Sequence, residues 1–113
     1  MKLKDLPEEE RPREKLLAHG ADSLSAVELL AVLLRTGRKG EDVLEFSASI
    51  LNDWGGLEGL CRAGARELMT EKGLSSSKAA TVAAVIELGN RIASLEGKDR
   101  DRWQTRLEMI AKE

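Results

Sequence analysis

The chain has 113 residues, which is enough for one small domain and too short for two of ordinary size. Charged residues make up 34% of it but nearly cancel, and the formal net charge of −2 excludes a strong basic field that would attract nucleic acid over long distances. Aromatic residues amount to only 3%, so leucine, alanine, valine and isoleucine must build the core.

The histidine and cysteine content limits the chemistry that the chain can perform. His19 and Cys61 are the only residues of their kinds, and a zinc site needs about three protein ligands, usually including several of them. The sequence also has no GxSxG elbow and no Walker-type loop. We therefore expect no catalysis, no metal site and no cofactor in this chain. Cys61 lies in an apolar stretch, which predicts a buried structural thiol.

No apolar run reaches the length of a membrane-spanning helix. The charged start, MKLKDLPEEERPREK, contains no hydrophobic core of a signal peptide. These two features together lead us to expect a cytoplasmic protein.

The pattern of apolar residues predicts an all-α fold, a small helical bundle. Pro12 suits the first position of a helix PREKLLAH, and Gly20 is well placed to end it. Ser25 and Glu28 have the spacing of a capping box, so the next helix should begin at Ser25. This second helix is apolar almost all round down to Leu34, which predicts a central position in the domain.

Shorter elements are expected in the middle of the chain. A turn rich in glycine and cations, RTGRKGED, precedes a helix in EDVLEFSASILNDWG, whose apolar stripe is Val43, Phe46, Ile50 and Trp54. Two glycines then break the helix, and the segments LEGLCRAG and ARELMTE are predicted to be short helical turns.

A second glycine turn, at Gly73, precedes a long helix that extends to about residue 92. Any of three successive serines can cap this helix: Ser75, Ser76 or Ser77. The turns at Gly37 and Gly73 sit in comparable places of two helix–turn–helix segments, LLRTGRKGEDVLEFSASIL and LMTEKGLSSSKAATVAAVI, which suggests a weak internal repeat.

The charged stretch EGKDRDRW is a candidate linker, which divides the chain into a helical domain at 1–96 and a linker with an amphipathic helix at 97–113. Trp103, Leu107 and Ile110 form the apolar side of this last helix. Because exposed apolar faces usually have a partner, we expect these three residues to contact another protein or a second copy of the chain.

Phosphate binding is the one chemical role that the residues support. A glycine turn before a helix start offers free N–H groups, the positive end of the helix dipole and room for close approach. The candidate phosphate ligands are Arg35, Gly37, Arg38 and Lys39 in the first turn, and Lys72, Gly73, Ser75, Ser76, Ser77 and Lys78 in the second. The alternative is that both turns only connect packed helices and that the serines only cap, as in most short helical hairpins.

Two long motifs resemble the N-terminal region of the RadC family, which is associated with DNA repair. They are LPEEERPREKLL followed by GADSLSAVELLAVLLRTG, and GGLEGLCRAGARELMTEKGLSSSKAATVAAVIELGNR. The resemblance covers about residues 1 to 93 and implies helix-hairpin-helix character, with either one such motif or two in tandem. It also implies that longer members carry a JAB/MPN metalloprotease-like domain with a zinc site of His and Asp ligands, which this chain lacks the histidines to form.

The resemblance implies a non-catalytic module that binds the DNA backbone without sequence preference. One position departs from the usual helix-hairpin-helix pattern of Gly, apolar residue, Gly, because Ser75 replaces the second glycine. If this position requires a positive φ, serine is unfavourable there. The alternative is a helical protein-interaction or regulatory domain that has lost DNA binding.

Overall fold

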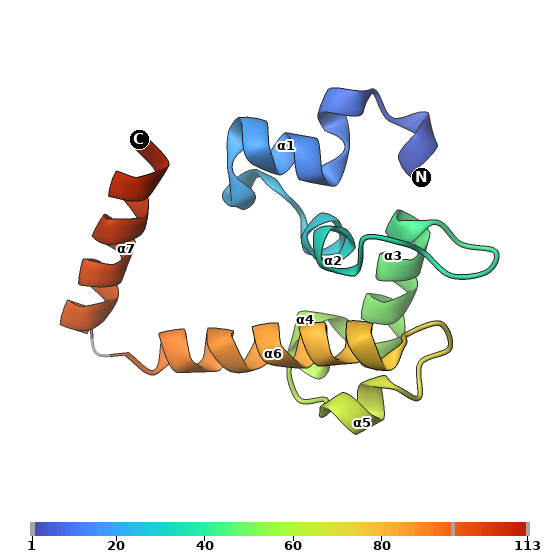
Figure 1. The fold of residues 1–113 in the computed structure, drawn as a ribbon. Helices are drawn as coiled ribbons and strands as arrows, with labels where there is room; N and C mark the ends of the chain where they lie inside the picture. Colours follow the sequence, from blue (N-terminus) through green and yellow to red (C-terminus); the bar gives the residue numbers. More distant parts are fainter. Residues whose placement is uncertain (1, 96, 113) are drawn as a thin grey trace. The chain divides into compact units, whose positions relative to one another are not determined.

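The computed structural model describes residues 2–95 and 97–112, with the backbone alone at 97–103 and 112, and it divides the chain into two compact units, Met1–Ala83 and Ala84–Glu113. Within the described residues the regular elements are all helical, which confirms the predicted all-α class (Figure 1). No helix in the described ranges is both long enough and apolar enough to cross a membrane. The expected division between 96 and 97 stays a prediction.

The first unit begins with short 3₁₀ turns around one helix. The turns are η1 (Leu3–Asp5), η2 (Glu8–Glu10) and η3 (Ala21–Ser23), and α1 runs between the last two as Pro12–His19. Pro12 stands at the first helical position, and Gly20 ends α1 with a φ of 92°. Both ends of α1 therefore agree with the sequence prediction.

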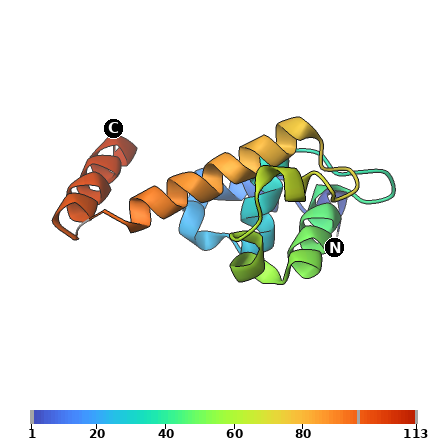
Figure 2. The same ribbon diagram turned by 90° about the horizontal axis from the view of Figure 1, so that it is seen from below.

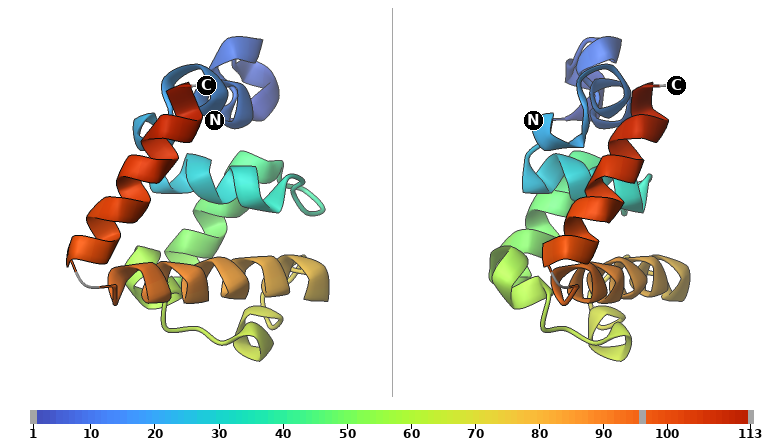
Figure 3. Two further views of the ribbon diagram at one scale, coloured as in Figure 1. Left: turned by 60° about the vertical axis from the view of Figure 1, so that its left-hand side comes forward. Right: turned by 90° about the vertical axis from the view of Figure 1, so that its left-hand side faces the viewer.

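Two longer helices form the centre of this unit. They are α2 (Ala26–Leu34) and α3 (Val43–Trp54), and α2 lies between α1 and α3 (Figures 1 and 3). The core residues that these two helices bury include Leu30, Leu34, Phe46 and Ile50. Helix α2 was predicted to be central because it is apolar, and it packs against the apolar stripe of α3.

Two short helices, α4 (Gly56–Leu60) and α5 (Ala65–Leu68), follow α3, and α5 lies beside α6 (Figure 2). Leu60 and Leu68 are their buried anchors. Cys61 does not share this burial: it is exposed, and its thiol donates to the carbonyl of Glu58 at 3.0 Å. The expected buried thiol is wrong because α4 ends at Leu60, which points inward, and the next residue turns away.

Helix α6 (Ser76–Ala93) starts in the first unit and continues into the second, which also contains α7 (Gly97–Lys112). Ala79 and Val82 bury the first turns of α6 in the core of the first unit. In α7, Leu107 and Ile110 are exposed at 61% and 62%, whereas the side chain of Trp103 lies outside the described residues.

The capping box at the start of α2 makes this helix sensitive to acid. The Glu28 carboxylate accepts from the Ser25 N–H at 2.9 Å, Ser25 Oγ accepts from the Glu28 N–H at 3.2 Å, and Lys15 Nζ lies 3.3 Å from Glu28 Oε2. The Ser25 N–H is the main cause that holds the pKa of Glu28 below its usual 4.5; partial burial opposes it and Lys15 adds to it. This stabilisation is present above pH 4.5 and is lost as the pH falls through the lower folded value.

We expect Glu28→Gln to lower the free energy of unfolding at pH 7 by about 0.5 to 1 kcal/mol, since an amide keeps part of the cap and loses the charge. The variant should also lose less stability than the wild type between about pH 5 and pH 3. Thermal unfolding followed by circular dichroism over this range measures both effects. Glu58→Gln, in a pair whose side chains are 74% and 82% exposed, is the matched control. Equal acid profiles for Glu28→Gln and the wild type would contradict the assignment.

Candidate nucleic-acid interface

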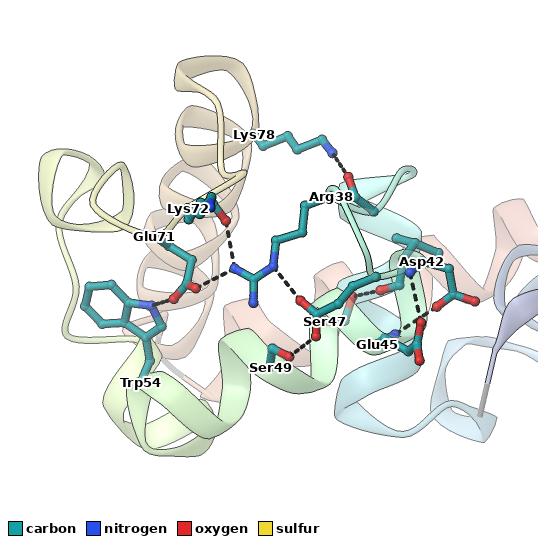
Figure 4. A network of polar contacts seen from close by, with 12 residues as sticks. Arg38, Asp42, Glu45, Ser47, Ser49, Trp54, Glu71, Lys72 and Lys78 are labelled. Carbon is teal, nitrogen blue, oxygen red and sulfur yellow. Dashed lines mark hydrogen bonds and ion pairs between the residues drawn. The ribbon is translucent and has the colours of Figure 1, made fainter.

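The two glycine turns of the sequence, residues 35–42 and 71–78, lie against each other in the first unit (Figure 4). Arg38 and Lys78 make the contacts between them, and both cations stand over the ring of Phe46, at 4.7 and 5.6 Å from its centroid. Phe46 itself is fully buried. The ring face carries negative charge density, so this arrangement favours the two cations at their place. We call this set of contacts the turn junction.

The first turn begins with an uncommon backbone conformation. Arg35 ends α2 with φ 69° and ψ −42°, and the Thr36 N–H donates to the Leu34 carbonyl at 2.8 Å, which closes a γ-turn. This conformation is strained for any residue with a side chain. Arg35 is the only non-glycine with a positive φ in the described ranges. The γ-turn reverses the chain direction directly after α2, so that the following residues reach the second turn.

Arg38 is held by acids and a carbonyl from both turns. Its Nε lies 2.5 Å from Glu41 Oε1, and its Nη1 lies 2.7 Å from both Glu71 Oε2 and the carbonyl of Lys72. The hydrogen bond to Glu71 is the main cause that raises the pKa of Arg38. The side chains of Arg38 and Glu71 are only 18% and 10% exposed, so the pair is shielded from most of the solvent.

Two side chains of α3 complete the polar network around this pair. Trp54 Nε1 donates to the second oxygen of Glu71 at 3.0 Å, and Ser49 Oγ donates to Glu41 Oε2 at 2.5 Å (Figure 4). The Ser49 hydroxyl and then Arg38 lower the pKa of Glu41. Charge-assisted hydrogen bonds of this kind fix geometry well, so the turn junction is a rigid feature of the first unit.

Lys78, in the first turn of α6, is directed at the other turn. Its ammonium group donates to the Thr36 carbonyl and hydroxyl, both at 2.7 Å, and approaches the Gly37 carbonyl at 3.5 Å. Lys78 and Arg38, both predicted as phosphate ligands, are thus engaged within the chain. Their predicted role as direct ligands stays a prediction, and their observed role is to position the turns.

Close packing requires glycine at two places of the turn junction. Gly73 has a φ of 89°, and a Cβ there would lie 2.6 Å from the Cβ of Arg38. At Gly37 a Cβ would lie 2.1 Å from the backbone oxygen of Glu41, which cannot move away as a side chain can. The sequence predicted these glycines for the approach of a phosphate, and the structure gives a second reason, the approach of the turns to each other.

Ser75 caps α6 and has no unfavourable backbone conformation. Its Oγ accepts from the Lys78 N–H at 3.2 Å, and its carbonyl accepts from the Ala79 N–H at 2.8 Å. Because Arg35 alone among the described non-glycine residues has a positive φ, serine in place of the usual glycine costs nothing of that kind here. The cap leaves the hydroxyls of Ser76 and Ser77 exposed at the helix start.

Two lysines of the glycine turns remain accessible. Lys39 and Lys72 are exposed, and their ammonium groups have no hydrogen-bond or ion-pair partner among the residues that the structure describes. The first turn of α6 carries no acidic residue. Together with the exposed hydroxyls and the free N–H groups that every helix start presents, these lysines form a small positive surface.

The sequence did not predict two residues of the turn junction, the acid that pairs with Arg38 and the tryptophan that donates to this acid. Glu71 and Trp54 received no role in it, because they lie 33 and 17 residues from their partners Arg38 and Glu71 and no local pattern links them. Among the described residues, no group of three or more His, Cys, Asp or Glu is arranged to hold a metal ion.

The fold and the turn junction define a small all-α domain in which two glycine turns are docked through the partly buried Arg38–Glu71 ion pair and the hydrogen bonds of Lys78. The sequence profile described as UPF0758 N-terminal matches residues 3–80, and the chain belongs to this family.

Curated relatives from several bacteria carry the same family name. The UPF0758 protein of Bacillus licheniformis is 55% identical over 100 residues, which cover 88% of this chain and 45% of the relative. A UPF0758 protein of Desulfitobacterium hafniense is 54% identical over 93 residues, or 82% of this chain and 41% of the relative. One from Polaromonas is 46% identical over 105 residues, or 93% and 47%. The chain thus spans less than half the length of these relatives, and no solved structure matches it.

Proposed function

We propose that this chain is a non-catalytic module of a RadC-like protein that binds the DNA backbone without sequence preference. The observation that carries the proposal is the positive surface on the turn junction, where Lys39 and Lys72 are unpaired beside the start of α6. Lysines, serine hydroxyls and helix N-termini are typical contacts to DNA phosphates, and such contacts carry no direct sequence information.

The turn junction supports this role by keeping the binding groups in place. Arg38 and Lys78 hold the two turns together, so Lys39, Lys72, Ser76 and Ser77 project from one rigid unit. A rigid surface loses less conformational entropy on binding than two independent loops. We propose that the two turns act as paired helix-hairpin-helix turns in this sense, with the inner cations positioning the outer ones.

The near balance of positive and negative charges determines the affinity for DNA that we expect. A net charge of −2 adds no long-range attraction, so the affinity should be modest and should depend on a few local contacts. With two or three phosphates contacted, log K should fall against log salt with a slope of about −2 to −3. The resemblance implies a metal-dependent hydrolase domain in longer relatives, and we propose that catalysis belongs to that part.

Fluorescence anisotropy with labelled duplex and single-stranded DNA at low salt tests this proposal. We expect Lys39→Glu combined with Lys72→Glu to weaken binding at least tenfold, because two favourable contacts become repulsive. Lys4→Glu combined with Arg66→Glu, the same charge change at two exposed positions on η1 and α5, is the matched control and should weaken it much less. Absence of binding by the wild type, or equal weakening by both pairs, would contradict the proposal.

A second candidate is a protein-interaction module, and the exposed apolar residues of α7 favour it. Leu107 and Ile110 stand one helical turn apart and are about three-fifths exposed. We expect the chain to self-associate through this surface at high concentration and Leu107→Ser/Ile110→Ser to remain monomeric. Sedimentation velocity measures this, with Glu108→Ser as the control on the same helix. A wild-type monomer at all concentrations would exclude self-association through α7.

A further inference from the structure

A cavity of about 760 Å³ lies between the start of α1, the end of α2 and the start of α3 in the first unit. Three arginines line it, Arg11, Arg13 and Arg35, against the single acid Glu14. The rest of its wall is largely apolar and includes Leu3, Val32 and Val43. Its volume falls in the range of small-molecule sites, which combine apolar walls with a few polar groups.

The side chains of the three arginines make no hydrogen bond or ion pair within the part of the chain that the structure describes. Arg11 is the strongest case, because its Nε is buried and has no hydrogen-bond partner in that part. A buried, charged donor without an acceptor is unfavourable, and buried polar groups are nearly always paired. The Nε–H group of Arg11 is therefore a hydrogen-bond donor in the cavity wall that lacks an acceptor and is shielded from solvent.

The backbone beside the cavity also offers hydrogen-bond donors. No side chain caps the start of α1, where the first N–H groups of a helix are unpaired. Arg35 is held at the rim of the cavity by the strained γ-turn that ends α2. A second hollow of the first unit has the opposite character, since five glutamates line it with Lys15 and His19.

We propose that this cavity binds a small ligand through a phosphate group. The three arginines outweigh Glu14 by two charges, which a phosphate monoester dianion balances and a single carboxylate does not. The guanidinium fork matches the oxygens of phosphate, and the apolar wall accepts the body of the ligand. A concave, partly apolar site fits a small molecule better than the rod-like DNA backbone. This proposal goes beyond DNA binding and assigns Arg35 to the cavity.

The test uses the full chain and three probes: inorganic phosphate, phenyl phosphate and benzoate. We expect both phosphates to shift the ¹H–¹⁵N signals of the arginine Nε–H groups, Arg11 among them, in a saturable way. Phenyl phosphate should bind more tightly than inorganic phosphate because of the apolar wall, and benzoate should bind at least tenfold more weakly than phenyl phosphate. Sodium chloride at matched ionic strength is the reference.

Arg13→Gln combined with Arg35→Gln should weaken phenyl phosphate binding at least tenfold, whereas Arg66→Gln, an exposed arginine on α5, should leave it within twofold. Arg11 is kept in these variants because its partial burial makes it more important for folding. Shifts that do not saturate, equal shifts with chloride, or equal weakening by Arg66→Gln would overturn the proposal.

A short DNA duplex serves as the competing ligand. If it does not displace phenyl phosphate, the cavity is a separate site, as proposed. If it displaces phenyl phosphate competitively, the arginines belong to the DNA surface and the small-ligand proposal is overturned. The DNA-binding test depends on Lys39 and Lys72, which do not line the cavity, so either proposal can fail without the other.

Discussion

Replacing Phe46 with alanine is expected to lower the free energy of unfolding by about 3 to 5 kcal/mol. The side chain is fully buried, so its loss leaves a cavity in the centre of the first unit. The variant also removes the ring beneath Arg38 and Lys78, at 4.7 and 5.6 Å from the centroid. Because small domains have a stability of only about 5 to 15 kcal/mol, this variant should be near the limit of folding.

Phe46→Leu separates the two contributions. Leucine fills most of the space and provides no aromatic face, so its cost should fall to about 1 to 2 kcal/mol. Urea unfolding followed by circular dichroism measures both variants, and Leu51→Ala is a control in α3 that removes a buried aliphatic side chain. A loss below about 1 kcal/mol for Phe46→Ala would contradict the central place of this ring.

Replacing Arg38 with alanine is the second large change. It leaves Glu71, whose side chain is 10% exposed, without the cation that lies 2.7 Å from it, and it also removes the bond to Glu41. Removal of one partner of a fully buried pair costs about 3 to 5 kcal/mol, and the remaining exposure reduces this here to about 2 to 3 kcal/mol. Arg62→Ala, in an exposed pair with Glu58, should cost less than about 0.5 kcal/mol.

A double-mutant cycle shows whether this cost comes from the pair itself. Glu71→Gln removes the charge and keeps a partner for the Trp54 N–H, which donates to Glu71 at 3.0 Å. We expect the combination with Arg38→Ala to be about 1 to 2 kcal/mol more stable than the sum of the single changes predicts. Strict additivity in urea unfolding would mean that the ion pair does not hold the two turns together.

The local features of the fold could be predicted from the sequence because each depends on neighbouring residues. Pro12 and Gly20 bound α1, and the capping box of Ser25 and Glu28 starts α2, as predicted. The short reach of these interactions, three or four residues, makes them visible as spacing. The prediction of a buried Cys61 failed because the burial of a residue at a helix end depends on where the next segment goes.

The turn junction could be predicted only in part. The sequence identified both glycine turns and their cations, but which cations are paired and which are accessible depends on contacts across more than 30 residues. Arg38 and Lys39 are adjacent and look equivalent in the sequence, yet the first is held by Glu41 and Glu71 and the second is exposed. Only the three-dimensional packing distinguishes a positioning cation from one that is available for a phosphate.

The most direct test of the proposed DNA-binding role is a ¹H–¹⁵N titration of the full chain with a short duplex at low salt. The backbone amides of residues 36–40 and 72–78 should shift together, and their shifts should decrease steeply when salt is raised. Lys39→Glu/Lys72→Glu should abolish these shifts while leaving the spectrum of the folded protein otherwise unchanged. No shifts at these two turns, or shifts confined to other elements, would contradict the role of the turn junction in DNA binding.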